Sequence, residues 1–201
     1  MNQLAQRISS FFVSHSLLPK NEEHIYTYCF EVILSGLFAW GSILILAILT
    51  HTLFPTLLYI GGFFIFRRYA GGYHAETHLK CYLLSLATYL FFLILTKFIP
   101  ESYYLNTCIV FIVIASLNLL CFSPIEHKNN PFTKKEKEFL KKKILFLMSI
   151  FLFIILVMLY INYINIVFFL SCGYLQAALS VTVAFYFKRR EKKLCEQFSP
   201  N

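Results

Sequence analysis

The segment 67–81 holds the densest group of reactive side chains in this sequence of 201 residues. It reads Arg-Arg-Tyr-Ala-Gly-Gly-Tyr-His-Ala-Glu-Thr-His-Leu-Lys-Cys. A cysteine nucleophile needs a base within hydrogen-bond reach of the sulfur and donors for the oxyanion that forms during attack. Cys81 and the two histidines before it, His74 and His78, therefore predict a thiol-dependent acyl transfer.

The spacing leaves two candidates for the base. On one continuous helix His74 and Cys81 would lie about 10.5 Å apart along the axis, which is too far for direct proton transfer. His74 can serve only if the chain folds back, and Gly71-Gly72 supply a backbone that can bend. His78 lies three residues before Cys81 on the same helix face, so spacing alone favours His78.

The other cysteines indicate no further site. A free cysteine is most often a buried packing residue. No C-x-x-C spacing occurs, so neither a disulfide framework nor a metal site is predicted, and no cofactor is required. The remaining five are expected to be structural, or exposed on the basic tail in the last case: Cys29, Cys108, Cys121, Cys172 and Cys195.

The composition places this segment in a membrane protein. Hydrophobic residues make up 58% of the chain and charged residues 14%, against about 45–50% and about 25% in soluble domains. This balance excludes a soluble globular protein, a disordered chain and a secreted disulfide scaffold. Nucleic-acid binding is excluded as well. The net charge is +8, but binding a nucleic acid needs a basic face on a soluble fold, and this composition does not form one.

Apolar runs of about 17–25 residues predict an all-α polytopic membrane protein with six transmembrane helices. The run at 51–66 is the weakest, because it is short and contains Pro55 and Gly61-Gly62. The last run carries several small and polar residues, so it is expected to face other helices rather than lipid. The six predicted spans are 29–49, 51–66, 82–98, 104–122, 144–161 and 163–187.

Charge predicts the orientation of these spans. Lys and Arg number two in 1–29, three in 67–81, seven in 123–143 and five in 188–201, but the segments 50–55 and 162–165 have none. The positive-inside rule then puts both termini and the basic segments in the cytoplasm. The chain is interpreted as one membrane domain, 1–201, with an N-terminal segment 1–28 and a basic cytoplasmic tail 188–201.

The N-terminal residues 2–18 have apolar side chains at helical spacing. This pattern predicts an amphipathic helix, either lying on the inner membrane surface or packed against the other helices.

The segment 123–143 predicts a helix start in front of the fifth span. Thr133 and Glu136 have the spacing of a capping box. The lysines that follow have two interpretations, a topology signal that also contacts anionic lipid, or a docking surface for an acidic partner. They are Lys134, Lys135, Lys137, Lys141, Lys142 and Lys143.

The run from Arg67 to Ala75, with Cys81 after five further residues, resembles the R-x-x-x-G-G-x-H-A-x5-C signature of the AgrB family. These accessory gene regulator proteins of Gram-positive bacteria are six-span cysteine endopeptidases of the cell membrane that mature a quorum-sensing propeptide. The similarity also includes the length, the N-terminal helix and the loop from Ser123-Pro124 to Pro131 with its lysines. Carried over, the signature implies that Cys81 is the nucleophile and His74 its partner, with Arg67, Gly71 and Gly72 as supporting residues. His78 is not a position of the signature.

The resemblance also implies a substrate and a reaction. The substrate would be an AgrD-like propeptide with an amphipathic N-terminal helix, a central Cys or Ser and an acidic tail. Cleavage at the cytoplasmic side would release the tail, leave a thioester on Cys81, and let the central thiol close a thiolactone ring. Arg67, Arg68 and Lys80 would favour the thiolate, which is the reactive form. The residue that orients His74 stays open between Glu76, an amide, a hydroxyl and a backbone carbonyl, and a homodimer stays open too.

Two other classes remain. A small non-enzymatic transporter or channel subunit would place ionisable groups within the spans, and only Glu31 and His51 lie there, both near span ends. A membrane acyltransferase or another peptidase could use the same cysteine.

Overall fold

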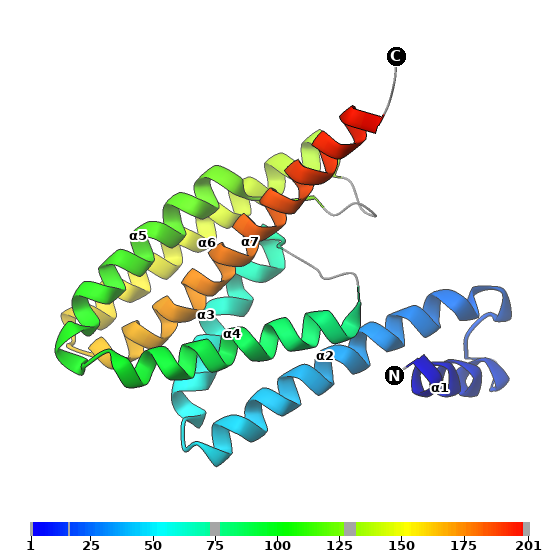
Figure 1. The fold of residues 1–201 in the computed structure, drawn as a ribbon, viewed down its shortest axis with the longest axis horizontal. Coiled ribbons are helices and arrows are strands. Elements are labelled where there is room, and N and C mark those ends of the chain that lie inside the picture. Colours follow the sequence, from blue (N-terminus) through cyan, green and yellow to red (C-terminus); the bar gives the residue numbers. More distant parts are fainter. Residues whose placement is uncertain (1, 16, 73–76, 127–131, 199–201) are drawn as a thin grey trace. The chain divides into compact units, whose positions relative to one another are not determined.

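The structure, a computed structural model, describes residues 2–15, 17–72, 77–126 and 132–198. Its described part is helical, and seven α-helices and two short 3-10 helices follow one another along the chain (Figure 1). Contacts divide the chain into two compact units. The first holds Met1–His51 and Ala75–Phe91, and the second holds Thr52–His74 and Phe92–Asn201. The elements are α1 Asn2–Ser14, η1 Lys20–Glu22, α2 Glu23–Leu49, α3 Leu53–Ala70, α4 His78–Phe98, η2 Glu101–Tyr103, α5 Tyr104–Phe122, α6 Lys134–Tyr160 and α7 Ile164–Phe198.

Five helical stretches among the described residues are long and apolar enough to cross a membrane. They confirm a membrane protein and correspond to five of the six predicted spans. The helix α3, which matches the run at 51–66, is not among them, and Arg67 and Arg68 in its last turn lower its hydropathy. The sixth span and the orientation of the termini therefore stay predictions. The five stretches are Lys20–Leu49, Leu79–Phe98, Glu101–Phe122, Lys134–Tyr160 and Ile164–Arg190.

In the first unit, the N-terminal helix α1 packs against α2, which agrees with the second of the two alternatives for this segment. Ser9 is buried and donates a hydrogen bond to the carbonyl of Glu23 (3.1 Å). The ring of Phe12 stacks on that of Phe30 with centroids 5.6 Å apart. The helix ends at Ser14, four residues earlier than the apolar spacing predicted.

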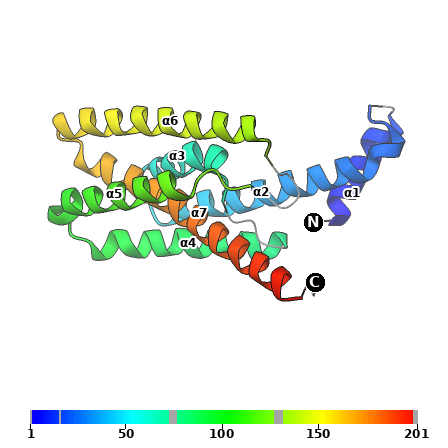
Figure 2. The ribbon, with the colours of Figure 1, turned by 90° about the horizontal axis from the view of Figure 1, so that it is seen from above.

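In the second unit, α7 lies against α3, α5 and α6 (Figures 1 and 2). Half of the most apolar stretch of α7 is buried, against 11–22% of the corresponding stretch in the other four candidate spans. This burial confirms that α7 faces protein. Phe66 of α3, Phe151 of α6 and Tyr174 of α7 form one ring cluster with centroids 4.4–5.2 Å apart.

Two glycines let α3 and α7 approach closely. A Cβ at Gly173 would overlap the carbonyl oxygen of Tyr59 and lie 2.8 Å from the amide nitrogen of Phe63. A Cβ at Gly62 would overlap the carbonyl oxygen of Leu170 and lie 3.2 Å from the amide nitrogen of Tyr174. Backbone therefore meets backbone at both points, as membrane helices do where small residues face each other.

The capping box predicted at the start of α6 is confirmed. The Thr133 hydroxyl accepts from the amide of Glu136 (3.3 Å), and the Glu136 carboxylate accepts from the amide of Thr133 (2.8 Å). The amide and the hydroxyl of Thr133 both donate to the Glu136 carboxylate, and these two bonds hold the pKa of Glu136 below its usual value. From this start α6 continues without interruption to Tyr160, so its lysines lie in the first turns of the helix, as predicted.

Candidate functional site

The first half of the reactive segment 67–81 is the end of α3 and the turn that follows it, called the braced turn here because the Arg67 side chain bonds its backbone. Gly71 has a φ of 76° and Gly72 a φ of 146°, so the helix stops where the sequence predicted. The Arg67 guanidinium Nη1 donates to the carbonyl oxygen of Gly71 (3.0 Å) and to the hydroxyl of Ser180 on α7 (3.2 Å). A cation that bonds a carbonyl after the last helical turn also interacts favourably with the helix dipole.

Both glycines of this turn lie against other parts of the second unit. A Cβ at Gly71 would lie 2.6 Å from the carbonyl oxygen of Ile125, and a Cβ at Gly72 would overlap Nη1 of Arg67. The amide of Ile125 donates to the carbonyl of Ala70 (3.0 Å), so the chain after α5 runs along the turn. Positive φ and lack of space together require glycine at both positions.

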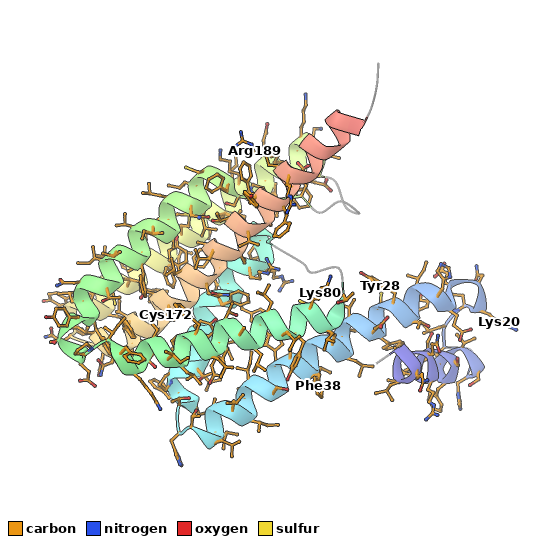
Figure 3. The ribbon with its side chains drawn as sticks, in the orientation of Figure 1. Lys20, Tyr28, Phe38, Lys80, Cys172 and Arg189 are labelled. Atoms are coloured by element: carbon orange, nitrogen blue, oxygen red, sulfur yellow. The ribbon has the colours of Figure 1, made fainter. Side chains whose placement is uncertain are left out.

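The second half of the reactive segment is the start of α4, in the first unit. The Thr77 hydroxyl accepts from the amide of Lys80 (3.3 Å), and the amide of Cys81 donates to the carbonyl of Thr77 (3.1 Å). Cys81 therefore lies in the first turn of a capped helix, just after Lys80 (Figure 3). Its side chain is half-buried and its thiol is free, whereas Cys108 and Cys172 are fully buried.

The predicted base lies outside the described residues. His74 and the candidate orienting residue Glu76 both belong to 73–76, and His78 is the first residue of α4. The pairing of His74 with Cys81 therefore stays a prediction, as does the preference for His74 over His78.

The lysines at the start of α6 belong to the same unit as the braced turn. Lys134, Lys135, Lys141 and Lys142 are exposed. The ammonium group of Lys143 lies 4.4 Å from the ring centroid of Tyr69, a residue of the reactive segment. This cation–π contact joins the basic start of α6 to the last turn of α3.

Glu126 connects two helices of the second unit through their basic ends. Its carboxylate lies 3.4 Å from Lys137 Nζ of α6 and 3.2 Å from Lys188 Nζ of α7, the residue before Arg189 (Figure 3). The hydrogen bond from Lys188, together with Lys137, holds the pKa of Glu126 below its usual value. The carboxylate is therefore ionised at neutral pH, and two of the basic residues already face an anion.

Three of these contacts were missed by sequence reasoning. Ser180 belongs to the last span, whose polar residues were expected only to face other helices, and Glu126 and Thr77 were given no role. Thr77 three residues before Lys80 is a helix-start signal that could have been found. Nothing in the sequence indicates that Ser180 meets Arg67 or that Glu126 meets Lys188, because these partners are 113 and 62 residues apart.

Residues 5–183 match the sequence profile of the family described as Accessory gene regulator B. A protein of Lactiplantibacillus plantarum described as AgrB-like is 33% identical over 91 residues. The aligned stretch covers 44% of this chain and 44% of that relative, so the chain matches less than half of the relative's length. No solved structure matches.

Proposed function

Because the chain belongs to the accessory gene regulator B family, we propose that it is a membrane cysteine endopeptidase of quorum sensing. Its substrate is an AgrD-like propeptide, from which it removes the acidic C-terminal tail. The observation that carries the proposal is the place of Cys81, a free and half-buried thiol in the first turn of a capped helix. Amide dipoles at a helix start favour negative charge, which is what an attacking thiolate carries.

The proposed reaction has two acyl transfers. His74 takes the proton from the Cys81 sulfur, and the thiolate attacks the carbonyl carbon before the tail. The C–N bond then breaks, His74 returns the proton to the leaving amine, and a thioester remains on Cys81. The central thiol of the propeptide attacks this thioester, Cys81 leaves as a thiolate and regains a proton, and a thiolactone results. One thioester replaces another, so the second step needs no external energy source.

A trapped thioester tests this mechanism. A propeptide whose central cysteine is replaced by alanine should form an adduct that travels with the protein on a denaturing gel, because the resolving thiol is missing. Neutral hydroxylamine should release the adduct, since it cleaves thioesters and leaves amides intact. The propeptide with its cysteine present should show little adduct at steady state and serves as the control.

The same gel separates the proposal from its alternatives. Tail release that depends on Cys81 but never gives a trappable adduct would contradict a covalent role for the thiol. A transporter or channel subunit would give neither cleavage nor adduct.

The acidic tail is proposed to bind the basic start of α6. Replacing the six lysines of this stretch with glutamine should raise the KM for propeptide by about tenfold or more, because attraction to a charged surface raises the local concentration of the tail. Added salt should weaken binding to the natural protein in the same way, since exposed charges are screened over about 8–10 Å at physiological ionic strength.

Glu126 sharpens this prediction, because it competes with the tail for Lys137 and Lys188. Glu126→Gln should lower the KM by about two- to fivefold, the range expected for the loss of exposed ion pairs. Glu138→Gln is the matched control, since it removes one negative charge from the same basic helix start. Equal effects of the two variants would mean that only the total charge matters.

A further inference from the structure

Two cations of the second unit lie around one aromatic ring. The ammonium Nζ of Lys143 on α6 lies 4.4 Å from the ring centroid of Tyr69 on α3, and the guanidinium Cζ of Arg68 lies 5.8 Å from the same centroid. The ring centroid of Phe139 lies 5.7 Å from Lys143 Nζ. These four residues form a cluster, the ring site. Two like charges held this close repel each other unless an anion lies beside them.

In the described part of the chain no carboxylate neutralises these two cations. The ion pairs described for this unit join Glu126 to Lys137 and Lys188. No hydrogen bond between described residues uses the five N–H donors of Arg68 or the three of Lys143. A cation–π contact does not consume these donors, so they can still bond the oxygens of an anion. The ring site therefore offers two cations and their donors to an anion from outside the chain.

The side of α6 that carries Phe139 continues as an exposed apolar surface along the candidate span. Phe146 and Phe153 follow at intervals of seven residues, which puts the three rings on one side of the helix. They are 64%, 65% and 67% exposed in chain order. Lys143 lies on this side between the first two rings and is the last charged residue of α6. The ring site therefore lies where an apolar, outward-facing surface reaches the polar edge of the membrane.

This location favours a lipid over an acidic peptide as the source of the anion. An exposed phenylalanine ring is stabilised among acyl chains and not in water. Lys and Arg near the end of a span extend their charged groups to the phosphates while their stems stay in the apolar region. Lys134, near which the acidic tail of the proposed substrate is expected, lies about 13.5 Å further from the span along the helix axis.

We propose that the ring site binds the head group of an anionic phospholipid. The phosphate accepts hydrogen bonds from Arg68 and Lys143, and an acyl chain of the same lipid lies along Phe139. The ring of Tyr69 holds the Lys143 ammonium beside the phosphate. The inference goes beyond the proposed function and does not depend on it, because neither the propeptide nor Cys81 takes part.

Native mass spectrometry of the full chain in detergent micelles tests the site. The protein is titrated with phosphatidylglycerol, which has a net negative charge, or with phosphatidylcholine of the same chain length, which has the same phosphate but no net charge. The first phosphatidylglycerol should bind at least about tenfold more tightly than phosphatidylcholine, because two basic residues attract a net negative charge. Equal affinities for the two lipids contradict the proposal.

Removing either cation should weaken the binding of phosphatidylglycerol by about fivefold, the effect expected of one basic residue near an anionic head group. The variants are Arg68→Gln and Lys143→Gln. Lys142→Gln is the matched control, since it removes the same charge from the neighbouring, exposed position of α6. It should weaken binding by at most about twofold, because exposed charges are screened. Equal losses in Lys142→Gln and Lys143→Gln would mean a diffuse basic surface and would overturn the inference.

Tyr69 tests whether the ring contributes to binding. Tyr69→Phe keeps the ring and should bind phosphatidylglycerol as the natural protein does. Tyr69→Leu removes the ring beside Lys143 and should weaken binding by about two- to fivefold, the range expected for an exposed cation–π contact. Circular dichroism in the same detergent measures the helix content of each variant. Natural affinity in a helical Tyr69→Leu protein contradicts the role of the ring, and the two charge variants test the site if Tyr69→Leu does not fold.

Competition distinguishes a lipid from other anions. Millimolar inorganic phosphate should leave the bound phosphatidylglycerol in place, because it has no acyl chain to lie along Phe139. A synthetic oligoglutamate peptide should leave it in place as well. Displacement by phosphate would reduce the ring site to a general anion site, and displacement by oligoglutamate would assign it to an acidic peptide. Either result overturns the inference.

Discussion

Replacing Cys81 with serine, or His74 with alanine, is expected to lower propeptide cleavage at least about 1,000-fold, because a nucleophile and its base act as one unit. Both variants should reach the membrane in normal amounts. Cys81 is half-buried in the first turn of α4. A serine at this position keeps the hydrogen bond that the backbone amide donates to the carbonyl of Thr77. Cleavage is measured as tail release on a gel, and abundance by blotting of the membrane fraction.

His78→Ala is the matched control for the choice of base. It removes an imidazole from the first residue of α4 and should keep substantial activity, although spacing alone favours His78. An inactive His78→Ala beside an active His74→Ala would reverse the assignment.

Replacing Gly173 with alanine is expected to destabilise the second unit by about 1–3 kcal/mol or more, the range for overpacked interiors. The new methyl group would overlap the carbonyl oxygen of Tyr59, and a backbone atom cannot move aside without moving α3. Gly62→Ala should act in the same way from the other helix. Unfolding in detergent, followed by circular dichroism, measures the change.

Gly61 provides the control for this pair of glycines. It neighbours Gly62 on α3, and a Cβ there would meet no atom within 4 Å. Gly61→Ala should be neutral or slightly stabilising, because alanine loses less backbone entropy on forming a helix. Equal destabilisation by Gly61→Ala and Gly62→Ala would contradict the close contact between α3 and α7.

Features that depend on neighbouring residues could be predicted from the sequence. The capping box of Thr133 and Glu136 and the helix end at Gly71-Gly72 are local, because the atoms concerned lie within a few residues of one another. Long apolar runs likewise predicted five helices that the structure contains. The polar residues of the last span predicted its burial, since lipid offers them no hydrogen bonds.

Contacts between distant residues could not be predicted. An apolar span has no strong polar face that would fix its rotation, so the sequence cannot say which side of α7 meets Arg67. The sequence also did not show which side of α1 is buried. The small residues Ala5 and Ser9 are buried, while the apolar residues Leu4 and Phe11 are exposed. The choice of His74 as base rested on resemblance alone and stays a prediction.

The capping box at Thr133 also fixes how far the lysines of α6 lie from the buried part of the helix. It fixes the first residue of α6, and the helix then rises about 1.5 Å per residue without a break. Lys134 is thereby held about 15 Å along the axis from Ile144, the first buried residue of this helix. The lysines between them therefore lie at fixed distances from the first buried turn of the helix, because neither end of this stretch can slide along the chain.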